Sequence, residues 1–230
     1  MLLRPSDIML ALKQALSLTT IKPVEGWSPL SEGSLVAWYK YDTGIELDGS
    51  LVEVWQDSST NSYDMTSSSG TRPTFDASSV NFNSATPEFL QTSGQIILKE
   101  AFTIAFRIQP TAFNNTILGD NTTTQEYLKL ISTTNLKLQI DGSSLVLSNS
   151  SAFSGAQNII ITRDSSNLVE LYVDGALEDD GSLSGYSDID ALGVRATDIN
   201  SFDGAMFEVQ IYDSSSAELN TNINDRLSNL

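Results

Sequence analysis

The sequence contains no cysteine and no histidine among its 230 residues. Without cysteine there is no disulfide, and thiolate zinc sites, iron–sulfur clusters and cysteine nucleophiles are excluded. Without histidine there is no imidazole base for a Ser-His-Asp triad and no imidazole metal ligand. The donors that remain for a metal are carboxylate, amide and carbonyl oxygens, which suit calcium or magnesium.

Basic residues are scarce, with 12 Lys and Arg against 29 Asp and Glu and a net charge of −17. Binding to nucleic acid or to an anionic membrane needs clustered cations, so this balance argues against both kinds of partner. No apolar run approaches the ~18 residues of a membrane span. Residues 1–18 carry one early basic residue and no small-x-small cleavage site, so we interpret them as a retained segment and not as a signal peptide.

Serine and threonine are abundant, at 33 and 20 residues, which is typical of short strands joined by polar turns. The 9 Phe, 7 Tyr and 3 Trp, within 40% hydrophobic residues, are enough for a core. From Leu35 onward apolar residues recur at every second position, which predicts half-buried strands. The clearest are Phe102 to Ile108, Leu136 to Ile140, Val169 to Val173, and the row Phe207, Val209 and Ile211.

Three local patterns add detail to this strand series. Ile159 to Ile161 predicts a strand buried on both faces. Asp141-Gly142 and Asp174-Gly175 are hairpin signals, and Gly204 follows Asp203 in a further turn where positive φ is expected. Ser214 to Ser216 offers N-caps for a terminal helix with Leu219, Ile223 and Leu227 on one face.

The first thirty residues differ from the rest. Ile8, Leu12 and Leu16 share one face of a short predicted helix, and an extended linker carrying Trp27 follows. A helix this short is only marginally stable alone, so its apolar face needs to pack against another surface. Either it docks on its own domain, or it is an anchor inserted into a partner. We therefore divide the chain into residues 1–30, a helix and linker, and 31–230, one antiparallel two-sheet sandwich of about a dozen strands.

The ordered segments of this sandwich resemble the laminin-G-like and concanavalin-A-like jelly rolls. The resemblance covers residues 35–230 and rests on the order and spacing of the pieces, since no single piece is diagnostic. They are LVAWYKYD (35–42), VWQDSS (54–59), GTRPTFDASSVNFN (70–83), FTIAFRIQP (102–110), TILGD (116–120), NIIITRDSSNLVELYVDG (158–175) and FDGAMFEVQIYD (202–213).

The resemblance implies a calcium site, because members of this family hold calcium with loop carboxylates and carbonyls at one rim of the sandwich. Three acidic loops qualify. Asp120 with Asn121 precedes Glu126, a second loop contains Asp203, and a third spans residues 178–180. Crowded carboxylates repel one another unless neutralised, which favours a cation, although ordinary acidic loops have the same composition. We take Asp120, Asn121 and Asp203 as the candidate ligands.

The resemblance also implies sugar recognition by exposed aromatics in rim loops. Tyr63, Phe113 and Tyr186 are the candidates, and each is equally compatible with a lid on the core. Catalysis is disfavoured, because the clustered acid motif of related glycoside hydrolases is absent. The carboxylates of Glu53 and Asp57, and of Glu170 and Asp174, would lie about 13 Å apart along a strand.

These observations predict a non-enzymatic module displayed outward from a larger assembly. A small jelly roll with an unprocessed N-terminal arm resembles virion surface proteins of tailed bacteriophages, particularly those of marine hosts such as cyanobacteria. That resemblance implies a capsid decoration or fibre protein on the virion surface, with capsid or tail proteins and a host-surface glycan as partners. A carbohydrate-active enzyme, a free lectin-like adhesin and a homo-oligomer remain open alternatives.

Overall fold

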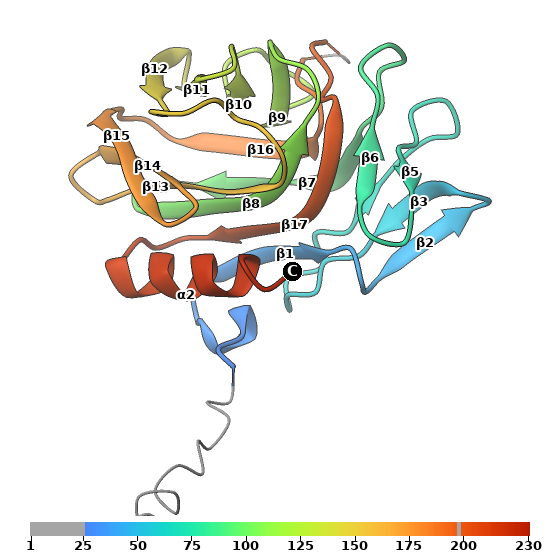
Figure 1. The fold of residues 1–230 in the computed structure, drawn as a ribbon, viewed down its shortest axis with the longest axis horizontal. Coiled ribbons are helices and arrows are strands. Elements are labelled where there is room, and N and C mark those ends of the chain that lie inside the picture. The colour runs from blue at the N-terminus through green and yellow to red at the C-terminus, as the bar shows by residue number, and fades with distance from the viewer. Residues whose placement is uncertain (1–25, 197–198) are drawn as a thin grey trace, which may run out of the picture.

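The computed structural model describes residues 26–196 and 199–230. The predicted N-terminal helix, with Ile8, Leu12 and Leu16, lies outside the described residues. The 3-10 turn η1 (Pro29–Ser31) and seventeen strands precede one helix, α2 (Ala217–Leu227), in the described part of the chain (Figure 1).

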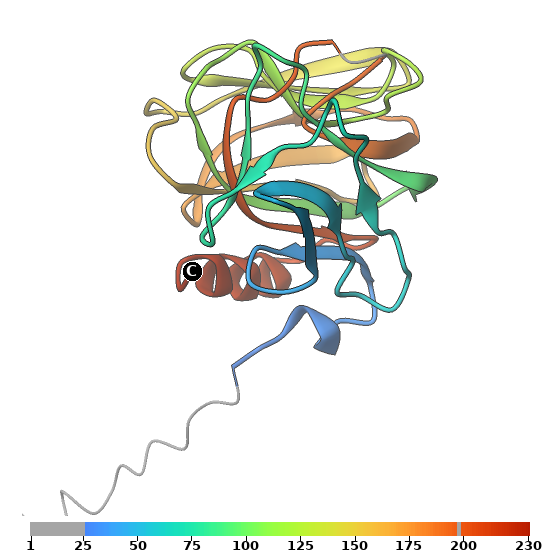
Figure 2. The same ribbon diagram turned by 90° about the vertical axis from the view of Figure 1, so that its right-hand side faces the viewer.

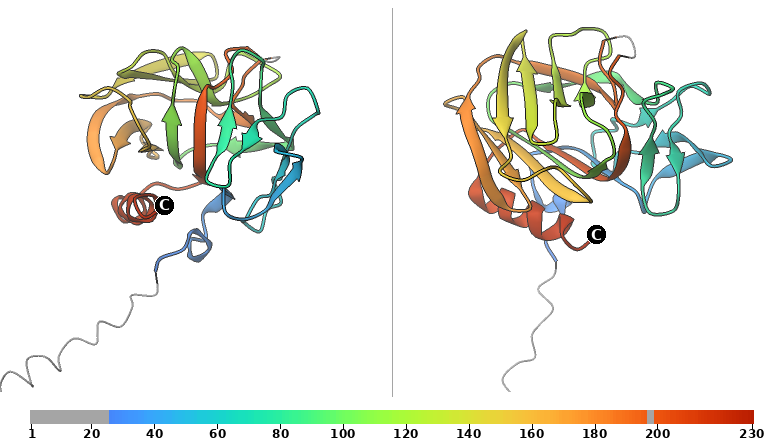
Figure 3. Two further views of the ribbon diagram at one scale, coloured as in Figure 1. Left: turned by 45° about the vertical axis from the view of Figure 1, so that its right-hand side comes forward. Right: turned by 45° about the horizontal axis from the view of Figure 1, so that its top comes forward.

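The strands form two antiparallel layers, as the all-β jelly-roll prediction required (Figures 1 and 3). The first layer contains, in order, β1 (Leu35–Lys40), β17 (Gly204–Tyr212), β8 (Phe102–Pro110), β13 (Gln157–Arg163), β14 (Leu168–Val173) and β15 (Ala176–Ser182). The second contains β4 (Met65–Thr66), β7 (Leu90–Leu98), β16 (Ser187–Leu192), β9 (Asn115–Gly119), β10 (Tyr127–Leu130), β11 (Asn135–Ile140) and β12 (Ser143–Ser148).

The two layers are joined along one side by hydrogen-bonded strands. From β17 to β4 the connection runs through β6 (Val80–Phe82), β5 (Thr74–Phe75) and β3 (Leu51–Trp55), and β2 (Ile45–Asp48) pairs with β3. On the other side β12 and β15 approach through side chains. The Leu145 side chain occupies the space that a Cβ on Gly181 would need. The backbone amide of Ser148 donates to the Asp179 carboxylate at 2.8 Å. The sheet is therefore nearly closed on itself.

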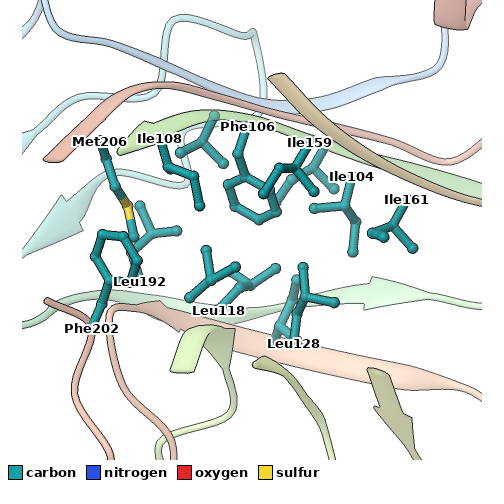
Figure 4. Packing of buried hydrophobic residues seen from close by; sticks show 14 of the residues in the cluster. Ile104, Phe106, Ile108, Leu118, Leu128, Ile159, Ile161, Leu192, Phe202 and Met206 are labelled. Carbon is teal, nitrogen blue, oxygen red and sulfur yellow. The ribbon is translucent and has the colours of Figure 1, made fainter. Parts of the chain in front are cut away.

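The core lies between the layers and contains the predicted apolar rows. Ile104, Phe106 and Ile108 of β8 face Leu118 and Leu128 of the second layer in Figure 4. β13 is buried on both faces, because Ile159 and Ile161 point into this core while Ile160 points outward to α2. The period of two therefore predicted the inward-facing residues of β8, and the isoleucine run predicted the double burial of β13.

The predicted row in the last strand is wrong at one residue. A bulge between Met206 and Glu208 shifts the pairing of β17 with β8, so that Met206, Val209 and Ile211 enter the core. Phe207 is half-buried, and the Arg107 guanidinium carbon lies 5.9 Å from the centroid of the Phe207 ring. A bulge adds one residue and reverses the alternation on one side of it, which the period of two does not reveal.

The turn predictions are confirmed by the backbone. Asp141-Gly142 and Asp174-Gly175 each have positive φ at both residues, as a two-residue type I′ hairpin requires. Gly204 has φ +138°, and a Cβ there would lie 2.2 Å from the Gln109 carbonyl oxygen, so a larger residue does not fit.

α2 packs on the outer face of the first layer (Figure 2). Ser216 caps it by accepting from the Leu219 amide at 3.1 Å, and Leu219, Ile223 and Leu227 are buried, as predicted. Trp27 packs on the same cluster and donates to Glu32 at 2.6 Å.

A buried charge network fixes the end of α2 to the sheet. Glu208 of β17 is 1% exposed and accepts from Trp38 Nε1 at 2.7 Å, Gln210 Nε2 at 2.6 Å and Arg226 Nε at 2.6 Å. The Arg226 guanidinium lies 4.7 Å from the Trp38 ring centroid.

Within residues 26–196 and 199–230, no helix has the length and apolarity needed to cross a bilayer.

Candidate functional site

Three carboxylates meet at the rim where β9, β10 and β16 approach one another. Asp120 follows β9, Glu126 precedes β10 and Asp188 lies in β16, and one oxygen of each lies within 4.8 Å of the others. We call these three residues the acidic triad. Asp120 and Glu126 are buried, whereas Asp188 is more accessible to solvent.

The electrostatics of the acidic triad are unfavourable without a proton or a cation. Burial and then the carboxylates of Asp188, Asp120 and Asp141 together raise the pKa of Glu126 to about 7. The Asp120 carboxylate accepts from the amide of Thr122 at 2.6 Å and from its hydroxyl at 2.7 Å, which fixes its orientation. Glu126 therefore holds a proton near neutral pH more readily than an ordinary glutamate does.

A fourth carboxylate connects the acidic triad to a neighbouring groove. Asp190 is 4% exposed and accepts from the Asn121 amide at 2.8 Å and from Gln91 Nε2 at 2.6 Å. Burial raises the pKa of Asp190, an effect that these two hydrogen bonds oppose. The Asn121 side chain in turn donates to Gln91 Oε1 at 3.3 Å.

The groove exists because β7 departs from regular pairing opposite β16. Ile189 pairs with Ile96 and Ala191 with Gln91, so residues 92–95 bulge out of the ladder. The resulting groove has a volume of about 580 Å³. Its walls are polar apart from one half-buried aromatic ring, and they are formed by Thr66, Ser67, Ser68, Phe89, Gln91, Thr92, Ser93, Gly94, Gln95, Thr122 and Asp190. We call this feature the β7 groove.

The donor set of the acidic triad fits a hard cation, since Asp120, Glu126 and Asp188 offer carboxylate oxygens within one coordination sphere. Asn121, a predicted ligand, lies beside Asp190. Asp203 lies in another loop, where its carboxylate accepts from Ser84 Oγ at 2.7 Å and from Thr111 Oγ1. Although burial opposes them, these hydrogen bonds lower the pKa of Asp203. The structure thus does not bring Asp203 into the acidic triad.

The third acidic loop of the sequence prediction is a strand. Residues 178–180 lie within β15, where Glu178 accepts from the Ser150 amide at 2.8 Å and Asp179 from the Ser148 amide at 2.8 Å. These carboxylates hold the end of β12 and the residues that follow it against β15. Their role in the fold explains their spacing without a cation.

The three predicted sugar-binding aromatics lie apart from the β7 groove. Tyr63 and Phe113 are half-buried against the main core, and the Tyr63 carbonyl accepts from Tyr39 Oη at 2.6 Å. Tyr186 is 61% exposed and borders a cavity of about 490 Å³ together with Ile97 and Lys99. Of the three, Tyr186 is the one placed to stack on a ligand.

The separated carboxylate pairs serve the fold. Glu53 forms an ion pair with Arg72 at 2.5 Å, and Glu170 accepts from Tyr172 Oη at 3.0 Å. Sequence reasoning missed Gln91, Asp188 and Asp190. The alternation of Asp188, Ile189 and Asp190 in β16 was a usable signal, because it places both carboxylates on the face opposite Ile189.

A family model described as the concanavalin A-like lectin/glucanases superfamily matches residues 88–218. The chain belongs to this superfamily. The match begins just before β7 and includes β16, so it contains the acidic triad and Asp190. No curated protein sequence matches the chain significantly.

Solved structures share the superfamily fold at low sequence identity. The binding domain of Paraclostridial Mosquitocidal Protein 1 has a TM-score of 0.56 at 15% identity, over 85% of this chain and 52% of that one. Domain 4 of the arabinanase AbnA from Geobacillus stearothermophilus, solved with arabinotriose, has a TM-score of 0.54 at 14% identity, over 83% and 98%. A Trypanosoma rangeli sialidase has a TM-score of 0.52 at 16% identity, over 96% of this chain and 39% of that one.

Proposed function

We propose that this chain is a non-enzymatic carbohydrate-binding module that takes a neutral glycan in the β7 groove. The observation that carries the proposal is the composition of that groove, where amides, hydroxyls and one carboxylate surround the half-buried ring of Phe89. Sugars are recognised by this combination, because hydroxyl groups exchange hydrogen bonds with amides and carboxylates while C–H faces pack on an aromatic ring.

The charge of the groove favours a neutral ligand. Asp190 is its one carboxylate, the acidic triad lies beyond it, and no lysine or arginine contributes to its walls within the described residues. An acidic sugar would therefore meet like charge. Domain 4 of the arabinanase AbnA, which shares this fold, was solved with the neutral saccharide arabinotriose, which is consistent with this choice.

The proposal extends to a role in an assembly. We propose that the module is a virion surface protein, a capsid decoration or fibre component, with the segment that contains Ile8, Leu12 and Leu16 as its anchor to capsid or tail proteins. What supports this is the composition, since a Ser- and Thr-rich, acidic chain without cysteine folds independently of redox conditions and stays soluble at high local concentration.

The test of glycan binding uses the full chain on an array of neutral and acidic oligosaccharides, followed by calorimetry. We expect Ser93→Trp, which fills the β7 groove from its exposed bulge, to weaken binding at least tenfold. Ser151→Trp adds the same ring at an exposed position outside the groove and should bind as the wild type does. Equal affinities for the two variants, or no neutral ligand on the array, would show that the β7 groove is not a glycan site.

A specific observation favours hydrolysis as the second candidate function. A glutamate with a pKa raised to about 7 beside other carboxylates is the pattern of a general acid, and Glu126 shows it. Against it, Glu126 is 5% exposed and does not line the β7 groove. Reducing-sugar release from the glycans that bind, lost in Glu126→Gln, would establish hydrolysis and replace the non-enzymatic proposal.

A further inference from the structure

The outer face of the second layer carries a cluster of cations. Leu128, Leu130, Leu136 and Leu138 point into the core. By alternation Lys129 and Lys137 lie on the opposite, outer face. Lys129 of β10 pairs directly with Lys137 of β11, so the two lysines are cross-strand neighbours.

An arginine completes this cluster. Arg195 lies over Gly119, where a Cβ would approach the Arg195 Cβ to 2.9 Å. Its guanidinium carbon is 4.2 Å from the ring centroid of Tyr127, and Lys137 Nζ is 5.5 Å from the same centroid. Tyr127 is 6% exposed, so two cations cover it. We call Tyr127, Lys129, Lys137 and Arg195 the cationic face.

These cations lack the partners that the other structural arginines have. Arg72 and Arg226 both form ion pairs with carboxylates. Among the described residues, the side chains of Lys129, Lys137 and Arg195 have no hydrogen-bond or ion-pair partner. This gathers three of only 12 basic residues in a chain of net charge −17, and no carboxylate of residues 26–196 or 199–230 forms an ion pair with them.

The cationic face is also short of hydrogen-bond acceptors. Arg195 Nε is buried without an acceptor, and so is the hydroxyl of Thr116, which pairs with Lys129 across β9 and β10. Lys129 is 7% exposed. Burial, and then the charges of Arg195 and Lys137, lower its pKa. Like charges directly opposite one another destabilise a sheet, so this arrangement works against folding unless it serves a ligand.

We propose that the cationic face binds the carboxylate or sulfate of an acidic sugar, with Arg195 and Lys137 holding the anionic oxygens. A planar guanidinium and an ammonium that share one ring offer charge-assisted donors to a single oxyanion. The inference rests on the proposed carbohydrate-binding function only in assigning the anion to a sugar. The site is separate from the β7 groove, on the face opposite to the one that carries α2.

The experiment uses the full chain with three probes at equal concentration: a galacturonate oligomer, a sulfated galactose oligomer and inorganic sulfate. The first two probes distinguish a carboxylate from a sulfate ester. The variant is Lys137→Gln, which removes one charge and keeps most of the side chain, and the matched control is Lys99→Gln at an exposed lysine bordering the Tyr186 cavity. Affinity is measured by calorimetry and stability by thermal melting.

We expect at least one acidic oligomer to bind the wild type and Lys99→Gln alike and to bind Lys137→Gln at least tenfold more weakly. We also expect Lys137→Gln to melt at a higher temperature without ligand, because it removes the repulsion from Lys129. Equal affinities for both variants, or no binding of either oligomer, would overturn the proposal. Protection by inorganic sulfate equal to that by the oligomers would mark an adventitious ion only. We expect Ser93→Trp to bind the acidic oligomer as the wild type does. Failure of the proposed cationic-face site is therefore distinguishable from failure of the proposed glycan site in the β7 groove.

Discussion

At the scale of single residues, Glu126 is the side chain whose environment most departs from its ordinary one. It is buried, and its nearest charged neighbours are carboxylates. A proton on Glu126 and a cation among Asp120, Glu126 and Asp188 are alternative ways to relieve the same repulsion. Stability should therefore depend on both pH and calcium through this one residue.

The pH dependence has a defined sign. Unfolded glutamate titrates near about 4.3, and in the native state the pKa of Glu126 is raised to about 7. Between these values the native state binds more protons, so the free energy of unfolding falls as pH rises through this window. We expect Glu126→Gln to flatten that slope and to be more stable than the wild type at pH 8 by on the order of 2 kcal/mol. Urea denaturation at several pH values measures it, with Glu218→Gln at an exposed helix position as the control.

The same variant tests the cation. If the acidic triad holds calcium, added calcium at pH 8 raises the melting temperature of the wild type, because a ligand bound by the native state alone stabilises it by mass action. Glu126→Gln should lose most of that increase. A wild-type melt that neither calcium nor chelator changes would contradict the cation site.

At the scale of elements, the attachment of α2 depends on a buried ion pair as well as on apolar packing. Glu208 is almost completely buried, and four donors from Trp38, Gln210 and Arg226 satisfy it. Removing one partner of such a pair leaves an uncompensated charge in the interior. Losing one partner of this ion pair should therefore lower the free energy of unfolding by more than the intact pair contributes to it.

We expect Arg226→Met to lower the free energy of unfolding by about 3 kcal/mol, because Glu208 stays buried without its cation. Arg72→Met is the matched control. Its partners Asp48 and Glu53 have side chains that are 68% and 50% exposed, and the loss there should stay below about 1 kcal/mol. Urea denaturation measures both. Equal losses would mean that burial of Glu208 does not set the strength of this contact.

The elements also show how far local patterns in the sequence reach. Hydrophobic alternation predicted β8, β11 and β14, and the Asp-Gly pairs predicted both type I′ turns, because these features depend on neighbouring residues alone. The bulge at Phe207 and the wider one at residues 92–95 depend on which strand lies opposite. Local sequence does not contain that information.

The candidate site was likewise predictable only where its residues lie close together in the sequence. Asp120 and Glu126 could be named from one acidic loop, but Asp188 comes from β16, which only strand pairing brings beside them. Asp190 and Gln91 meet only because β16 lies beside β7. Lys129 and Lys137 were not identified, since their charges signal nothing until the register of β10 and β11 places them opposite one another.

At the scale of the whole molecule, the question is what the N-terminal segment does for the sandwich. Trp27 packs on the α2 cluster and so belongs to the fold in the structure, although the sequence division placed it in the arm. The segment proposed as an anchor is therefore better separated after residue 25 than after residue 30.

We expect deletion of residues 1–25 to leave the melting temperature within a few degrees of the wild type and to abolish incorporation into the particle. Deletion of residues 1–30 should melt several degrees lower, since it also removes Trp27 from its apolar contacts with α2. Thermal melting and co-sedimentation of tagged protein with particles measure the two effects. A chain lacking residues 1–25 that still co-sediments would refute the anchor.

The position of the two ends of the described chain has a practical meaning. Gly26 and Leu230 border one cavity of about 390 Å³, beside α2 and on the side away from the cationic face (Figures 1 and 2). A bead, chip or fusion partner attached at Leu230, or directly at Gly26 in a chain shortened to that residue, would consequently hold the domain in the same orientation. The outer surface of β9 to β12 would then point into the medium from both attachment points.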